Sequence, residues 1–227
     1  MLDAIILDVG GVLLVPHPEP VEQALAPLGV SVDAERAVRA HFVGIRALDA
    51  TDPASDRYAY LTAYARALGI PDTQLDQALG CLRALWRVPA IDLWRQPIPG
   101  SAEALRRLAA SGRKLAIVSN SDGSVERQLQ LHRICQVGEG LGVPVLAVID
   151  SAVVGVAKPA AEIFRHALEP LGVEPERAAY VGDTLRYDVA GARAAGLQPV
   201  HFDPYTLCPE RDDHPHVRAL AELETVV

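Results

Sequence analysis

Residues 4–13 have the sequence AIILDVGGVL, in which four apolar residues are followed by Asp8 and then, after Val9, by two glycines. A run that is apolar at every position is typical of a strand buried on both faces of a parallel sheet. Functional groups in such sheets collect at the carboxyl ends of the strands. Asp8 is therefore the first candidate site residue.

Further apolar runs of strand length follow much later in the chain. They lie at residues Leu115–Val118, Val145–Ile149, Ala178–Val181 and Pro199–Phe202. Helical periodicity separates most of them, at Ser101–Ala110, Ala160–Leu171 and Asp188–Ala195. This alternation predicts an α/β fold, with a Rossmann-like parallel sheet covered by helices on both faces.

The segment after the first strand has a different pattern. Helical periodicity and turn signals follow one another there, at Val21–Leu28, Ala34–Leu48, Arg57–Leu68 and Thr73–Trp86. Strand-like runs are almost missing from it. We therefore expect a core domain made of residues 1–17 and 96–227, with an inserted helical domain at residues 18–95.

Composition limits the classes of partner. The 227 residues carry 21 Lys and Arg against 29 Asp and Glu, a formal net charge of −8, which disfavours nucleic acid as a partner. The sequence lacks an apolar window of membrane-spanning length, so no membrane partner is expected. The cysteines at 81, 135 and 208 lack paired spacing, which favours a reducing cytoplasm. Monomer and homodimer both stay open.

Polar residues follow each of the later strands. Ser119 and Asn120 come after one, Lys158 lies in the loop after the next, and Asp183 and Asp188 follow the fourth run. Each alone fits a turn or a helix cap. Their order at successive strand ends favours a shared site instead.

These residue types suit phosphoryl transfer. Asp8 can attack phosphorus, and Asp8 and Asp183 can bind Mg²⁺, which offsets the repulsion between carboxylate and phosphate. Glycines at 10 and 11 bring the backbone close to the phosphate. Ser119, backbone N–H groups near it at Asn120, and Lys158 can bind the transferring group.

The sequence resembles the haloacid dehalogenase (HAD) superfamily of hydrolases over nearly its whole length. Four stretches carry the likeness, namely Asp8–Leu13, Val118–Asn120, Gly155–Pro159 and Val181–Ala192. The fourth is the most specific, because the likeness extends along that whole stretch. The helical insert is similar to the C1 cap of subfamily I, which selects small substrates.

The resemblance implies a Mg²⁺-dependent phosphatase of a small phosphorylated metabolite. Asp8 would be the nucleophile and form an aspartyl-phosphate intermediate. The metal ligands would be Asp8, the backbone carbonyl of Gly10 and Asp183. Asp188 would belong to the metal site by orienting a metal-bound water or Lys158.

One position departs from the family pattern. Phosphatases of the family usually have a second Asp two residues after the nucleophile, and this chain has Gly10 there. That Asp protonates the leaving oxygen, a contribution typically worth about 10²–10⁴-fold in rate. His17 and Asp122 are alternative acids, although a loop residue and a helix cap are the simpler interpretations. A good leaving group would need less protonation.

Two other functions stay open. A 2-haloacid dehalogenase needs no metal, but it usually has Tyr where this chain has Gly10 and lacks the acid at Asp183. A catalytically weak binding protein is supported by Gly10 alone. Separately, the tail contains His201, His214 and His216, for which a surface loop is expected and a second metal site is the alternative.

Overall fold

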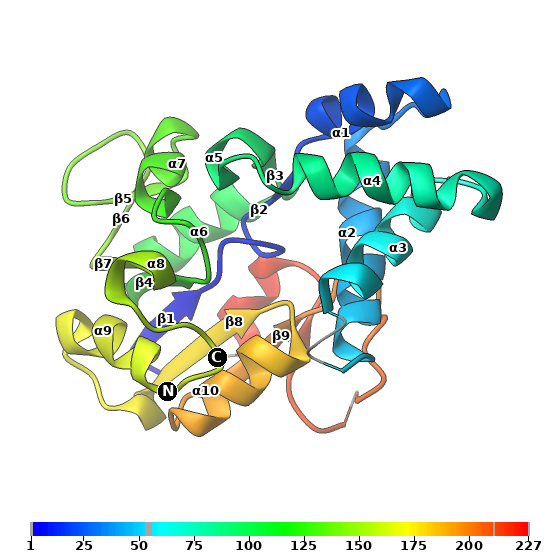
Figure 1. The fold of residues 1–227 in the computed structure, drawn as a ribbon. Coiled ribbons are helices and arrows are strands. Elements are labelled where there is room, and N and C mark those ends of the chain that lie inside the picture. The colour runs from blue at the N-terminus through cyan, green and yellow to red at the C-terminus, as the bar shows by residue number, and fades with distance from the viewer. Residues whose placement is uncertain (1, 53–55, 211, 227) are drawn as a thin grey trace. The chain divides into compact units, whose positions relative to one another are not determined.

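A computed structural model of the chain describes residues 2–52, 56–210 and 212–226. Six of the described strands form one sheet in the order β10-β9-β8-β1-β4-β7, and every pair in it is parallel. The parallel α/β fold predicted from the sequence is confirmed (Figure 1). The sheet strands are β1 Ala4–Leu7, β4 Lys114–Ser119, β7 Ala147–Asp150, β8 Ala178–Gly182, β9 Gln198–Phe202 and β10 His216–Val217.

Strand β1 lies between β4 and β8. Leu7 is opposite Ile117 on one side and Val181 on the other, and the Asp8 N–H donates to the Val181 carbonyl at 2.9 Å. After β1 the chain builds the sheet outward through β4 and β7, and then returns to add β8, β9 and β10 on the other side. The strand order thus reverses beside β1, where ligands bind in open parallel sheets.

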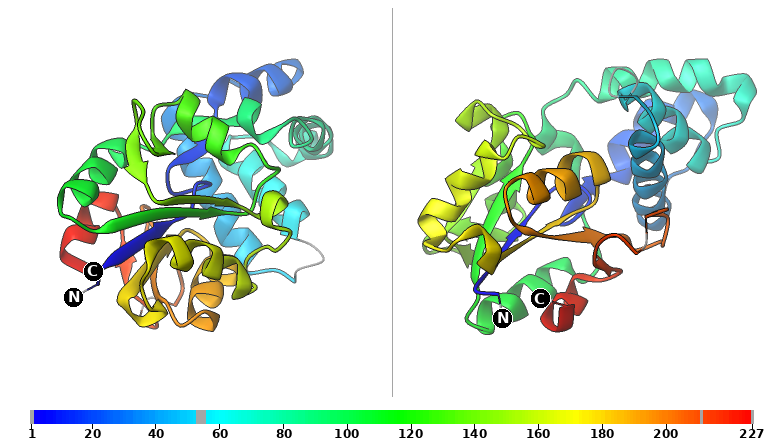
Figure 2. Two further views of the ribbon diagram at one scale, coloured as in Figure 1. Left: turned by 90° about the vertical axis from the view of Figure 1, so that its left-hand side faces the viewer. Right: turned by 90° about the horizontal axis from the view of Figure 1, so that it is seen from below.

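Helices cover both faces of this sheet, with α9 and α10 on one face and α6 on the other (Figure 2). Ile6, Val118 and Tyr180 of the sheet pack with Ile163 and Phe164 of α9 in a single apolar cluster. The helices of this unit are α6 Ser101–Ala110, α7 Val125–Leu131, α8 Ser151–Val154, α9 Glu162–Leu171, α10 Ala190–Ala194 and α11 Leu223–Val226, with short turns η4 Pro175–Arg177, η5 Leu185–Val189 and η6 Leu220–Glu222.

The described residues separate into two compact units, one formed by those of 2–13 and 97–226 and the other by those of 14–96. The second unit is helical and has its own apolar core, to which Leu25, Tyr64 and Leu79 contribute. The sequence pattern predicts that this unit begins at residue 18. The unit begins at Leu14 instead, because β2 pairs with β3 and so belongs to it. Its elements are β2 Leu14–Pro16, α1 Pro18–Leu25, η1 Ala26–Leu28, α2 Ala34–Asp49, α3 Asp56–Ala67, η3 Asp72–Gln74, α4 Leu75–Leu85, α5 Ala90–Leu93 and β3 Trp94–Pro97.

Three local features differ from the sequence predictions. The run predicted as one strand at 145–149 is divided between β6 Val143–Val145, which pairs with β5 Cys135–Val137, and β7 of the main sheet. The helix expected at 188–195 begins earlier, as the π-helical turn η5. The tail adds β10, which the sequence pattern did not reveal because a strand of two residues has no periodicity.

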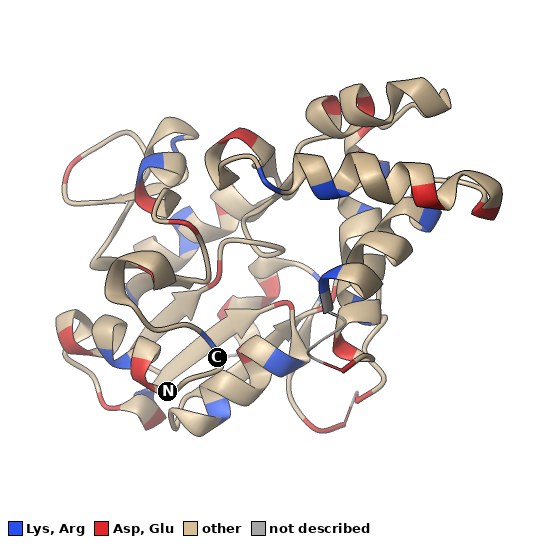
Figure 3. Cartoon of the chain, viewed as in Figure 1, with Lys and Arg blue, Asp and Glu red and all other residues tan. Residues whose placement is uncertain are grey.

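Charged residues are interspersed along the elements of each unit (Figure 3). Among the residues that the structure describes, no helix combines the length and the hydropathy needed to cross a bilayer.

Candidate active site

Asp8 follows β1 directly, and its side chain is buried. The N–H of Val9 donates to Asp8 Oδ1 at 2.7 Å, and Lys158 Nζ lies 2.8 Å from Oδ2. Both carboxylate oxygens therefore have a fixed partner. A carboxylate held in this way cannot rotate freely, so its position at the carboxyl edge of the sheet is fixed.

Lys158 is buried, with only 4% of its surface exposed. Its ammonium group contacts three oxygens, namely Asp8 Oδ2 at 2.8 Å, Asp188 Oδ1 at 2.7 Å and the Tyr180 hydroxyl at 2.7 Å. An ammonium group has three N–H donors. All three are used, which offsets the cost of burying the charge.

Asp188 is placed by the turn η5. The N–H and hydroxyl of Thr184 donate to Asp188 Oδ2 at 2.9 and 2.6 Å, and the Asp188 N–H donates back to the Thr184 hydroxyl at 3.2 Å. These reciprocal bonds leave Asp188 Oδ1 facing Lys158. Thr184 thus positions Asp188, and Asp188 in turn positions Lys158.

The pKa values follow from this crowding of charge. Burial raises the pKa of Asp8 to about 7, against the attraction of Lys158 and with help from the negative charges of Asp188 and Asp183. Burial also opposes ionisation of Asp188, but Lys158 and Thr184 outweigh it and lower the pKa of Asp188. The two carboxylates raise the pKa of Lys158 although burial acts the other way.

Ser119 and Asn120 lie at the end of β4, as the sequence predicted. Ser119 is buried and lies opposite Asp150 in the sheet. The amide group of Asn120 donates to the Lys158 carbonyl at 3.0 Å and accepts from the Lys158 N–H at 2.8 Å. The structure therefore gives the Asn120 side chain a role in positioning Lys158, which the sequence alone did not suggest.

Sequence reasoning missed Tyr180, a buried residue of β8. Its hydroxyl accepts from Lys158 and lies 3.1 Å from both the Val118 carbonyl oxygen and Asp188 Oδ1. Tyr180 occurs within an apolar run, where an aromatic residue is expected in the core. The one available signal was its place in the strand. Tyr180 lies two residues before Gly182, so the two share a face of the sheet at the carboxyl end of β8.

Gly182 allows Asp188 to approach the backbone of β8. A Cβ atom at this position would lie 2.3 Å from the Cβ atom of Asp188, far closer than two carbon atoms can pack. Glycine at 182 is therefore needed for Asp188 to reach Lys158. Gly11 has a positive φ of 69°, which glycine adopts without strain.

The donor set fits a divalent cation. One carboxylate oxygen from each of Asp8, Asp183 and Asp188 lies within 4.8 Å of the others, and all three side chains are buried. Lys158 forms ion pairs with Asp8 and Asp188, and its single charge can neutralise only one ionised carboxylate of the group. Mg²⁺ prefers such oxygen ligands. The residues expected to hold Mg²⁺ are thus compatible with it.

The two alternative acids have local partners. Asp122 is exposed and accepts from the N–H and hydroxyl of Ser124, in the turn before α7. The ring of His17 accepts from the Glu19 N–H at 3.3 Å and caps α1 in the helical unit. His17, interpreted from the sequence as a loop residue, is therefore the N-cap of α1, whereas Asp122, interpreted as a helix cap, lies in the turn before α7, whose N-cap is Ser124.

Comparison with known proteins agrees with this fold. The model of the haloacid dehalogenase-like hydrolase family matches residues 2–196. A phosphoserine phosphatase from Thermus thermophilus is 34% identical over 160 residues, which is 70% of this chain and 59% of that protein. The chain belongs to the haloacid dehalogenase-like hydrolases. It spans less than two thirds of the length of the curated relatives that it matches first.

Solved structures match over almost the whole chain. A HAD phosphatase from Thermococcus onnurineus has a TM-score of 0.59 at 24% identity, covering 99% of this chain and 97% of that one. A 2-haloacid dehalogenase from Pseudomonas syringae pv. tomato has a TM-score of 0.58 at 23% identity, covering 100% and 98%. At this level of identity the two structures establish a shared fold, and they do not distinguish the two activities.

Proposed function

We propose that this chain is a Mg²⁺-dependent phosphatase of a small phosphorylated metabolite. One observation carries the proposal. The buried carboxylate of Asp8 is held at the strand end by Lys158, beside two further buried acids. The similarity to a phosphoserine phosphatase supports the same class of reaction.

In this proposal Asp8 attacks the phosphorus atom of a phosphate ester. An oxygen of Asp8 forms the new bond to phosphorus while the ester P–O bond breaks, and the alcohol leaves with a proton taken from solvent. Water then attacks the aspartyl phosphate, which releases inorganic phosphate and restores Asp8. Lys158 stays beside Asp8 and stabilises the negative charge that develops on the transferring group.

Asp8, Asp183 and the Gly10 carbonyl would hold Mg²⁺, with Asp188 orienting Lys158 or a metal-bound water. When bound, Mg²⁺ neutralises charge between the carboxylates and the phosphate. Ser119 and the backbone near Gly11 and Asn120 would bind phosphate oxygens. The helical unit would act as the cap that selects the substrate.

Gly10 shapes the expected substrate. A glycine has no group that could protonate a leaving oxygen, and Asp122 already accepts two hydrogen bonds from Ser124. Leaving groups that are weak bases need little protonation. We therefore infer a preference for esters of acidic alcohols, such as an anomeric or enolic phosphate.

The test is phosphate release from a panel of phosphorylated metabolites, measured with Mg²⁺ and after EDTA. Wild type is compared with Asp8→Asn and with the control Asp3→Asn, which removes a partly exposed acid paired with Arg177. We expect metal-dependent turnover in wild type and the control. Asp8→Asn should lose on the order of 10³-fold or more of kcat.

Each alternative gives a different result in the same assay. Halide release from a 2-haloacid in EDTA, abolished by Asp8→Asn, would replace the proposal with a dehalogenase. Tight ligand binding without turnover of either substrate class would replace it with a binding protein. A phosphoryl group found by mass spectrometry on the peptide that contains Asp8 would support the proposed intermediate.

A further inference from the structure

Four side chains with metal-ligating atoms meet at β9, β10 and the loop that joins them. They are His201 of β9, Cys208 and His214 of the following loop, and His216 of β10. One ligand atom from each lies within 4.8 Å of all the others. His201, Cys208 and His214 are buried, with about 5–6% of their surface exposed. The surface loop expected for these histidines is therefore wrong.

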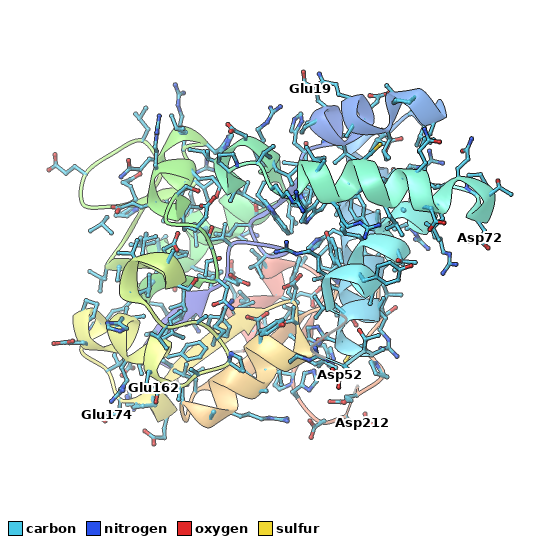
Figure 4. All side chains as sticks on the ribbon, in the orientation of Figure 1. Glu19, Asp52, Asp72, Glu162, Glu174 and Asp212 are labelled. Carbon is cyan, nitrogen blue, oxygen red and sulfur yellow. The ribbon has the colours of Figure 1, made fainter. Side chains whose placement is uncertain are left out.

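The backbone brings the four residues together. His201 lies opposite His216 in the parallel pair β9–β10, and the His201 N–H donates to the Pro215 carbonyl at 2.8 Å. The carboxylate of Asp203 accepts from the N–H groups of Leu207 and Cys208 at 2.8 and 3.1 Å, which folds the loop back. The cluster is thus held by the fold, whereas Asp212 of the same loop is exposed (Figure 4).

Two of the distances within the cluster suit a tetrahedral ion. His201 Nδ1 lies 3.1 Å from His214 Nε2, and Cys208 Sγ lies 3.9 Å from the same nitrogen. With ordinary Zn–N and Zn–S bonds, a tetrahedral site separates two nitrogens by about 3.3 Å and a nitrogen from a sulfur by about 3.6 Å. The observed separations lie within a few tenths of an ångström of these values.

A hydrogen bond also orients the His201 ring for a cation. His201 Nε2 lies 3.0 Å from the Asp183 carbonyl oxygen, which can only accept, so Nε2 carries the proton and Nδ1 presents a lone pair to the cluster. His214 presents Nε2 to the cluster, and its Nδ1 lies 3.7 Å from Asp213 Oδ2, too far for a hydrogen bond. A carbonyl partner behind the ring, as at His201, is typical of metal-ligating histidines.

We propose that His201, Cys208, His214 and His216 bind a structural Zn²⁺ ion, separate from the site at Asp8. Three imidazole nitrogens and one thiolate match the softer ligands that Zn²⁺ takes, whereas Mg²⁺ takes oxygen ligands. On binding, the Cys208 thiol gives its proton to the buffer as the Zn–S bond forms. Because His201 also bonds the Asp183 carbonyl, the ion would hold the backbone that carries an acid of the candidate active site.

The first test uses the metal-free wild-type protein in excess Mg²⁺, which occupies oxygen sites, with Co²⁺ as a spectroscopic probe. We expect one equivalent of Co²⁺ to bind per chain, with the intense visible bands of tetrahedral Co²⁺ and a thiolate-to-cobalt charge-transfer band. One equivalent of Zn²⁺ should abolish both signals. Absence of the charge-transfer band would overturn the proposal.

The second test locates the site. Cys208→Ser should remove the charge-transfer band and lower Zn²⁺ affinity by at least about 100-fold, because loss of even a supporting residue typically costs about 10–100-fold. The control Cys135→Ser, at another buried cysteine of the same unit, and Asp8→Asn should bind Zn²⁺ as wild type does. Equal affinity in Cys208→Ser and Cys135→Ser would overturn the proposal. If Cys208→Ser does not fold, the wild-type spectrum decides the question.

Discussion

The ammonium group of Lys158 lies 2.7 Å from Oδ1 of Asp188. Because Lys158 also lies 2.8 Å from Asp8 Oδ2, Asp188 and Asp8 compete for one buried positive charge. Burial raises the pKa of Asp8, whereas Lys158 and Thr184 outweigh burial and lower the pKa of Asp188. One ammonium group cannot neutralise both carboxylates when both are ionised, which favours a further cation beside them.

Lys158→Met should destabilise the protein strongly. It leaves two buried carboxylates without their shared partner, and breaking a buried pair typically costs about 3–5 kcal/mol. Urea unfolding measures the loss. The control Lys114→Met removes a single hydrogen bond to the Leu171 carbonyl and should cost about 1 kcal/mol. Adding Asp8→Asn to Lys158→Met should recover part of the loss, and strict additivity of the two changes would contradict the shared pairing.

Tyr180→Phe should lower both stability and turnover. The change removes the hydroxyl that contacts Lys158, Asp188 and the Val118 carbonyl, at a cost of about 1–3 kcal/mol. Because Tyr180 acts by positioning Lys158, kcat should fall about tenfold while KM stays nearly unchanged. Tyr58→Phe is the control, since Tyr58 is 55% exposed. A rise in KM at constant kcat would assign Tyr180 to substrate binding instead.

Gly182→Ala should disable the site with little change to the fold. The added methyl group would lie 2.3 Å from the Asp188 Cβ atom, so Asp188 must move away from Lys158. We expect kcat to fall more than about tenfold and stability to fall by about 1–3 kcal/mol. Gly80→Ala, in α4 where the added atom meets nothing within 4 Å, should be neutral or slightly stabilising. Wild-type kcat in Gly182→Ala would show that Asp188 tolerates the shift.

Gly10→Asp should raise turnover of esters with poor leaving groups. The new carboxyl group would supply a proton donor where the chain has none, an effect typically worth about 10²–10⁴-fold. Esters of acidic alcohols should gain much less, so the dependence of kcat on the leaving-group pKa should flatten. A fall in turnover for every ester would show that another acid already occupies that space.

Much of the sheet could be predicted because buried parallel strands have distinctive apolar runs, as at Ala4–Leu7 and Ala178–Gly182. The polar residues that follow these strands could be named for the same reason. Tyr180 could not, because its importance comes from contacts with Lys158 and Asp188, residues on other elements. A second metal site at the three histidines was only the alternative to a surface loop, because their burial depends on the two residues of β10 pairing beside β9. The part played by Cys208 could not be predicted.

The position of β1 in the sheet sets the order in which a newly synthesised chain can become active. Its neighbours β4 and β8 are made later, and the register of Leu7 with Val181 joins residues roughly 170 positions apart. At typical synthesis rates, about 10–30 s separate the appearance of these two strands. Asp8 thus leaves the ribosome long before Lys158 and Asp188, so a chain interrupted before Lys158 carries the proposed nucleophile without the charge that holds it.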